Sequence, residues 1–140
     1  MRIAVIDGQG GGIGRHITEK LRRALSEETE IIALGTNSLA TAAMLKAGAN
    51  EGATGENAIV QTSKKVDIIT GAVSILVANS MFGEVTPKIA EAVGSAEAIK
   101  VLLPVNRSNI EIVGAVNEPL PHQIDKIVDF IKKYGGNHNV

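Results

Sequence analysis

The chain has 140 residues, a formal net charge of −1 and no cysteine. This length suits one domain that buries roughly 68–70% of the surface its unfolded chain exposes, and the lack of cysteine excludes disulfides, thiolate metal sites and a cysteine nucleophile. Because 14 basic and 15 acidic side chains are spread along a chain with only two phenylalanines and one tyrosine, neither a basic surface nor a stacking platform for nucleic acid is expected.

Short apolar runs alternate with stretches of helical period, which favours a parallel sheet with helices on both faces. In the first half of the chain, Ile13, Ile17 and Leu21 recur every four residues, so an amphipathic helix follows the first strand. The strands expected here are Arg2–Asp7, Glu30–Leu34 and Asn50–Thr54. The second helix ends near Ala47 with Asn37 or Ser38 as its cap, and the third covers Gly55–Lys64 with Thr54 as its cap.

The second half of the chain continues the alternation. Thr86 and Pro87 supply a cap and a first-turn proline, which predicts a helix over Pro87–Ser95. The apolar run Ala72–Phe82 is expected to be buried, and we favour helix over strand there. The strands expected in this half are Val66–Thr70, Ala98–Leu103 and Ile110–Val113, and a last helix over Pro121–Tyr134 stops at Gly135-Gly136.

The last two predicted strands are too close together for a parallel crossover. Only Pro104–Asn109 separates them, whereas a crossover needs roughly a dozen residues or more, so Ile110–Val113 is expected to be antiparallel or at the sheet edge. The pattern predicts a single-domain Rossmann-like α/β/α sandwich of three layers. Its mostly parallel sheet has roughly five or six strands. The domain covers residues 1–134, and residues 135–140 form a polar tail.

Five of the eight residues from Asp7 to Gly14 are glycine, between the first strand and the first helix. Such a loop aims backbone N–H groups and the positive end of a helix at one point, which is typical of a phosphate site. The pattern G-x-G-x-x-G fails because its third position is Ile13, whereas Gly8, Gly11 and Gly14 fit G-x-x-G-x-x-G. Gly8, Gly12 and Gly14 fit G-x-x-x-G-x-G, and Arg15-His16 excludes a P-loop.

Both spacings resemble the glycine loops of short-chain dehydrogenases and reductases. Their Tyr-x-x-x-Lys pair is missing, because the sole tyrosine, Tyr134, is followed by glycines, so their reaction is not implied. An NAD site would also have a carboxylate where this chain has Leu34–Asn37, so NADP is slightly favoured over NAD, and a mononucleotide stays open. A tight turn without a ligand is the alternative. The expected cofactor-binding residues are Gly8, Gln9, Gly10, Gly11, Gly12, Ile13, Gly14, Arg15, Thr36 and Asn37.

Polar side chains that follow predicted strands are candidates for substrate binding or catalysis, because ligands of open α/β sheets bind there. The substrate-binding candidates are Asn79, Ser80, Asn106 and Arg107, the last two as an anion clamp or an exposed turn. The catalytic candidates are Asp7, equally a turn residue, Glu84 and His122. No metal site is expected, because no two histidines have metal-ligand spacing.

The whole chain resembles a family of short bacterial proteins that is known as a domain of unknown function. The resemblance lies in Asp7–Gly14, Ala33–Asn37, Gly52–Asn57, Ala78–Met81, Gly83–Pro87, Leu103–Arg107 and Glu118–His122. It implies a single-domain bacterial cytoplasmic protein and no particular activity. No leader or membrane-spanning apolar run is seen either, so a membrane partner is not expected.

Three hypotheses about function follow. The first is a protein that binds a nucleotide or dinucleotide at Gly8–Gly14, with its reaction unknown. The second is a small enzyme for a phosphorylated or carboxylated metabolite, in which Asn79, Glu84, Asn106 and Arg107 converge on one pocket. The third is a structural or interaction module whose Ala72–Phe82 segment forms a homodimer interface.

Overall fold

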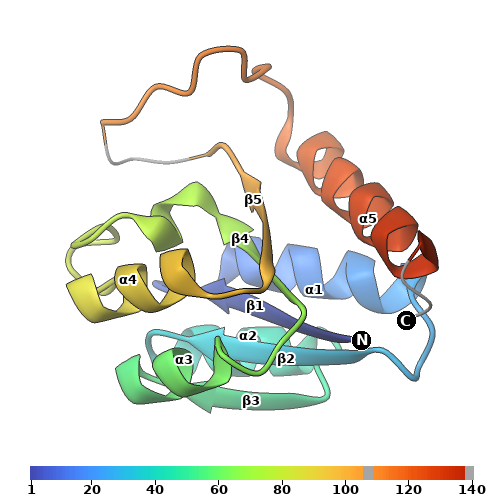
Figure 1. Cartoon of the computed structure of the whole chain (residues 1–140), viewed down its shortest axis with the longest axis horizontal. Coiled ribbons are helices and arrows are strands. Elements are labelled where there is room, and N and C mark those ends of the chain that lie inside the picture. The colour runs from blue at the N-terminus through green and yellow to red at the C-terminus, as the bar shows by residue number, and fades with distance from the viewer. Residues whose placement is uncertain (106–108, 138–140) are drawn as a thin grey trace.

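The computed structural model describes residues 1–105 and 109–137, and within them five parallel strands form one sheet (Figure 1). The order in the sheet is β3-β2-β1-β4-β5. From β1 the chain adds β2 and β3 on one side of the sheet and then adds β4 and β5 on the other side of β1. The boundary between β1 and β4 is the switch point, where Rossmann-like sheets bind ligands. The predicted α/β fold with a parallel sheet is confirmed. The strands are β1 (Arg2–Asp7), β2 (Glu30–Gly35), β3 (Glu51–Thr54), β4 (Ile68–Ala72) and β5 (Ile99–Leu103).

Helices cover both faces of the sheet, which gives three layers (Figure 1). One face packs against α1 (Gly12–Ala24), α2 (Ser38–Lys46) and α5 (Leu120–Asn137), and the other against α3 (Glu56–Thr62), α4 (Pro87–Ser95) and the short 3₁₀ helix η1 (Val73–Leu76). Successive strand residues point to opposite faces. In β1, Ile3 and Val5 therefore pack into the first core, and Ala4 and Ile6 pack into the second.

Two of the three predicted helix caps are confirmed. The Asn37 side chain accepts a hydrogen bond from the Ala40 N–H at 2.9 Å, and the Thr86 hydroxyl accepts one from the Ile89 N–H at 3.2 Å. The prediction for Thr54 is wrong, because its hydroxyl is 2.7 Å from that of Thr41 and α3 begins after Gly55 without a side-chain cap.

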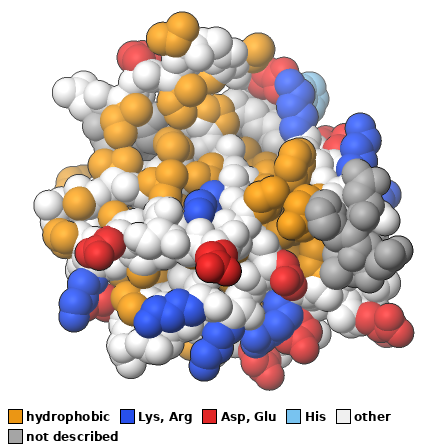
Figure 2. Space-filling model, viewed as in Figure 1, with side chains coloured by type: hydrophobic (Ala, Val, Ile, Leu, Met, Phe, Trp, Pro, Cys, Tyr) orange, Lys and Arg blue, Asp and Glu red, His pale blue; other side chains and the backbone are white. Residues whose placement is uncertain are grey.

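The strand predicted at Ile110–Val113 is wrong. These residues have no strand pairing, and β4 is the only described neighbour of β5. Figure 1 shows residues 109–119, ahead of α5, arching away from the sheet, and Figure 2 shows apolar side chains gathered in that region. An alternating apolar pattern forms a strand only where a sheet edge pairs with it and buries one face. The exposed large apolar side chains of this connection are Val105, Ile110, Ile112, Val113 and Val116.

The helix favoured for Ala72–Phe82 is also wrong. The run forms one turn of 3₁₀ helix over Val73–Leu76 and then a series of turns in which Asn79, Met81 and Phe82 have positive φ, incompatible with a right-handed helix. Ile75 is buried as expected, but Phe82 is 98% exposed.

The predicted glycine stop is wrong as well, because α5 continues through Gly135 and Gly136 to Asn137. A glycine in a helix costs only about 1 kcal/mol relative to alanine. The packing of Ile131 and Tyr134 against the core anchors the helix up to that point. Across residues 1–105 and 109–137, no helix combines the length and apolar character needed to cross a membrane.

Candidate functional site

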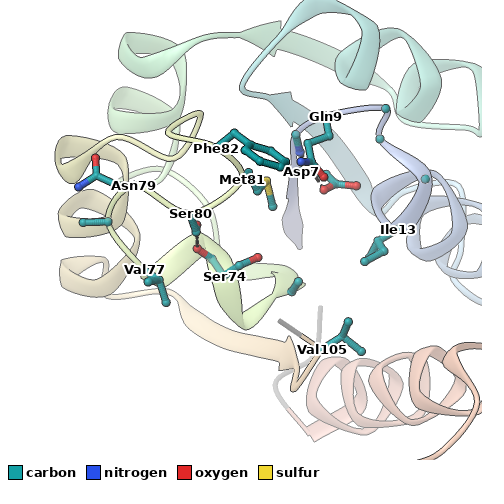
Figure 3. Close-up of a pocket in the computed structure, with 16 residues that line it drawn as sticks. Asp7, Gln9, Ile13, Ser74, Val77, Asn79, Ser80, Met81, Phe82 and Val105 are labelled. Carbon is teal, nitrogen blue, oxygen red and sulfur yellow. Dashed lines mark hydrogen bonds between the residues drawn. The ribbon is translucent and has the colours of Figure 1, made fainter. Parts of the chain in front are cut away.

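A cleft of about 640 Å³ lies at the carboxyl ends of β1 and β4, the switch point of the sheet (Figure 3). Its first wall is the glycine loop from Asp7 to Ile13. The second wall is Ala72, the last residue of β4, with Ser74 and Val77–Phe82 from the chain that follows. Val105, two residues beyond the end of β5, completes the lining. The predicted glycine loop therefore borders a concave site of the size that holds small molecules.

Three backbone N–H groups of the glycine loop have no hydrogen-bond partner among the described residues. The Gly11 N–H donates to the Gly8 carbonyl at 2.9 Å, and the N–H groups of Gly8, Gln9 and Gly14 donate to carboxylates. Within the described residues, nothing accepts from the N–H groups of Gly10, Gly12 and Ile13. They lie at the start of α1, where the helix dipole is positive, so the loop offers three donors to an anion.

The Asp7 side chain fixes the two ends of the glycine loop by hydrogen bonds. One carboxylate oxygen accepts from the Gly8 N–H and the other from the Gly14 N–H, both at 2.7 Å, and the residue is 7% exposed. Burial raises the pKa of this carboxyl above its ordinary value, against the two N–H groups that lower it, and the nearby Glu84 carboxylate raises it further. Because both oxygens are engaged, Asp7 acts here as a positioning residue for the loop.

Glu84 joins the loop after β4 to the end of β2. Its Oε1 accepts from the Thr36 hydroxyl at 2.7 Å, from the Gln9 N–H at 2.8 Å and from the Asn37 amide at 2.9 Å. The Thr36 hydroxyl and the Gln9 N–H hold the pKa of Glu84 below its ordinary value. We call these four residues the Glu84 clamp. The clamp occupies the side-chain donors of Thr36 and Asn37, two of the expected cofactor-binding residues, and Glu84, Thr36 and Asn37 do not line the cleft.

The five glycines of the loop fall into two groups. A Cβ on Gly8, Gly11 or Gly14 would lie 2.5 Å from Thr36 Oγ1, 2.8 Å from Ala40 Cα or 2.6 Å from Met44 Sδ, respectively. Gly11 also has a φ of +72°. A Cβ on Gly10 or Gly12 would meet nothing within 4 Å. The fold therefore requires glycine at the G-x-x-G-x-x-G spacing and leaves Gly10 and Gly12 unexplained.

The other predicted site residues are only partly brought together. Asn79 and Ser80 line the cleft, but the Ser80 hydroxyl donates to the Ser74 carbonyl at 2.6 Å and the Asn79 side chain points away from the cleft in Figure 3. Arg15 is exposed, 3.8 Å from Glu19, and His122 is exposed on α5. Neither lines the cleft. Asn106 and Arg107 lie outside the described residues, so their predicted role stays a prediction.

The convergence required by the small-enzyme hypothesis is not seen for its described members. Asn79 lies on the cleft and Glu84 in the clamp, bound to the end of β2. Among residues 1–105 and 109–137, no three acidic or histidine side chains gather closely enough to hold a metal ion. The cleft therefore offers backbone N–H groups that can donate hydrogen bonds to an anion, next to a wall of apolar and polar side chains.

Sequence reasoning missed several residues of the wall, namely Ala72, Ser74, Val77, Ala78, Met81, Phe82 and Val105. Ile75 of the same segment is buried, which agrees with the burial expected for its apolar pattern. The sequence does hold one signal for Phe82. It is followed directly by Gly83, and glycine at that position is more typical of a turn than of a buried helix.

A family model described as a domain of unknown function (DUF3842) matches residues 2–135, so this chain belongs to that family. The resemblance to a domain of unknown function is thereby confirmed. Comparison with curated proteins gave no match, and comparison with solved structures gave none either. The family carries no assigned ligand or reaction, so function has to be argued from the cleft.

Proposed function

We propose that this protein binds a phosphorylated ligand of mononucleotide size in the switch-point cleft. Its phosphate accepts hydrogen bonds from the Gly10, Gly12 and Ile13 N–H groups, and the rest of the ligand lies along the wall after β4. The observation that carries the proposal is the set of three N–H groups without described partners on residues that line the cleft at the start of α1.

The two unexplained glycines favour a ligand over an empty turn. Where a residue has ordinary φ and open space, glycine makes the folded chain less stable than alanine by about 0.4–1 kcal/mol, because its unfolded state is more flexible. Gly10 and Gly12 meet both conditions. A loop that only had to turn would need glycine at 8, 11 and 14 alone. Close approach of a phosphate to the backbone accounts for the other two.

The Glu84 clamp favours a mononucleotide over a dinucleotide. A dinucleotide spans the switch point from the end of β2 to the end of β4. Here Thr36 and Asn37 at the end of β2 donate to Glu84, and its carboxylate would repel a 2′-phosphate. NADP, slightly favoured by the sequence, therefore has less support than AMP or another nucleoside monophosphate.

The test is a thermal-shift titration with AMP, GMP, CMP, UMP, NAD and NADP at millimolar concentration. A ligand at 100 times its dissociation constant stabilises the protein by about 2.7 kcal/mol. In a domain of this size we expect the unfolding midpoint to rise by roughly 8 °C. No shift with any of the six compounds would refute the proposal.

Alanine variants of the glycines separate ligand binding from folding. Gly12→Ala should unfold at the same temperature as the wild type or higher, yet bind the ligand at least tenfold more weakly. Gly94→Ala in α4, where a Cβ would lie 3.9 Å from its nearest neighbour, Leu76, is the matched control with unchanged binding. Unaltered affinity for the ligand in Gly12→Ala would show that its phosphate does not bind to this loop.

A further inference from the structure

We propose that the ligand carries an aromatic base and that Phe82 is the surface on which the base stacks, an inference that rests on the proposed function. Phe82 lines the cleft and is 98% exposed. Phe82 lines the same cleft as Asp7 and Gln9 of the glycine loop, and all three are labelled in Figure 3. An aromatic ring in this position offers a free apolar face next to the phosphate donors.

The backbone holds Phe82 in this position. The Gly83 N–H donates to the Asn79 carbonyl at 3.1 Å, the Glu84 N–H to the Met81 carbonyl at 3.1 Å and the Val85 N–H to the Ser80 carbonyl at 3.2 Å. Two residues further along, Glu84 is bound to the Gln9 N–H. The turn that carries Phe82 is therefore tied to the glycine loop itself.

Packing against the core accounts for Met81 in this turn but not for Phe82. Asn79, Met81 and Phe82 all have positive φ, which side chains rarely adopt, and Phe82 gains no burial from it. Strained residues of this kind cluster at ligand sites, where the surrounding structure holds a side chain in a working position. The hydrogen bonds of the turn maintain this strained conformation, which leaves the Phe82 ring exposed on the cleft.

The chemistry of the ring selects the class of ligand. A nucleobase has a flat π face that stacks on an aromatic ring, whereas a sugar phosphate reaches the N–H groups and presents no such face. Phe130 and Tyr134 stack on each other along α5, with ring centroids 6.4 Å apart. Phe82 is thus the only aromatic residue of the cleft within the described chain.

Calorimetry with AMP, GMP, CMP, UMP and ribose 5-phosphate tests this inference. The wild type should bind its best nucleoside monophosphate at least tenfold more tightly than ribose 5-phosphate. Phe82→Ala should weaken the affinity for the nucleotide by about 5- to 150-fold and leave the affinity for ribose 5-phosphate unchanged, since stacking contributes in that range. Phe82→Trp should restore nucleotide affinity, and Phe130→Ala, on α5, is the matched control.

The outcomes separate the two proposals. Equal affinity for ribose 5-phosphate and every nucleotide overturns the stacking role and leaves a phosphate site standing. Binding of none of the five compounds overturns both. If Phe82→Ala turns a dimer into a monomer while nucleotide affinity stays the same, Phe82 belongs to an interface between copies and the stacking role is wrong. Its exposure makes a folding defect in Phe82→Ala unexpected, and circular dichroism checks this.

Discussion

Replacing Asp7 with asparagine tests whether the buried carboxylate holds the glycine loop. In the wild type, two oxygens accept from two backbone N–H groups at 2.7 Å each. Asparagine has one acceptor oxygen and one NH₂ group. Whichever way its amide is turned, the NH₂ group faces the N–H of Gly8 or of Gly14, and a buried donor is left without an acceptor.

The size of the loss follows from two opposing contributions. A hydrogen bond to a charged group is worth about 1.5–3 kcal/mol, and leaving a buried donor unsatisfied costs about 1–3 kcal/mol. Against this, burial raises the pKa of Asp7, so the ionised carboxylate is itself disfavoured in the folded protein and asparagine avoids that cost. We expect Asp7→Asn to lower the free energy of unfolding at pH 7 by about 1–2 kcal/mol, or roughly 3–6 °C in the midpoint.

The pH dependence gives the sharper readout. The folded pKa of Asp7 lies above its ordinary value of 3.8, so its contribution to stability is complete below that value and is lost as the pH rises through the folded pKa. The difference in stability between the wild type and Asp7→Asn should therefore shrink as the pH rises. Urea unfolding from pH 4 to pH 7 measures it. Asp67→Asn is the control, since Asp67 is an exposed residue whose carboxylate accepts from the Arg2 N–H at 2.8 Å. A difference that grows with pH, or none at all, would refute the reasoning.

Two further predictions concern the clamp and the oligomeric state. The pKa of Glu84 is lowered by Thr36 and Gln9, so the stability it contributes is present above its ordinary value of 4.5 and is lost as the pH falls through the folded pKa. Glu84→Gln should therefore lose less stability on acidification than the wild type in urea unfolding, and an equal acid loss would contradict this. The homodimer through Ala72–Phe82 stays a prediction that sedimentation tests, since a dimer has twice the chain mass of 14.6 kDa. A strictly monomeric mass counts against it.

Local patterns carried the prediction of the fold, and long-range pairing limited the prediction of the site. The first strand, the glycine loop and α1 were predictable because an apolar run, a glycine cluster and a helical period stand next to each other in the sequence. The hydrogen bond between the Thr36 hydroxyl and the Glu84 carboxylate joins residues that are 48 positions apart, so no local sequence pattern predicts it. A sequence with no acidic residue at the end of β2 therefore suggested a free 2′-phosphate site, whereas the chain after β4 supplies a carboxylate there.

The errors in the second half of the chain have a common physical cause. Apolar composition in Ala72–Phe82 and Ile110–Val113 predicted burial and regular structure, yet these segments follow the carboxyl ends of β4 and β5, where the chain turns away from the sheet. Backbone conformation there is set by turns with positive φ, as at Phe82, and by the lack of a neighbouring strand, as at Val113. Periodicity reports how residues would pack within an element, but not whether a partner element is present.

The clamp and the cleft together make the switch point asymmetric, and this asymmetry bears on how a ligand enters. A Cβ on Gly8 would touch Thr36 at the end of β2 and Met81 and Glu84 from the chain after β4, so the loop is tightly packed at this position. On the β4 side, Gly10 and Gly12 have open space and their N–H groups lack described partners. A phosphate that reaches these donors must therefore come from the side of Ser74 and Phe82. Gly8 and Gly11 also line the cleft, so Gly10 and Gly12 differ from them in the open space around their Cα atoms and in N–H groups without described partners.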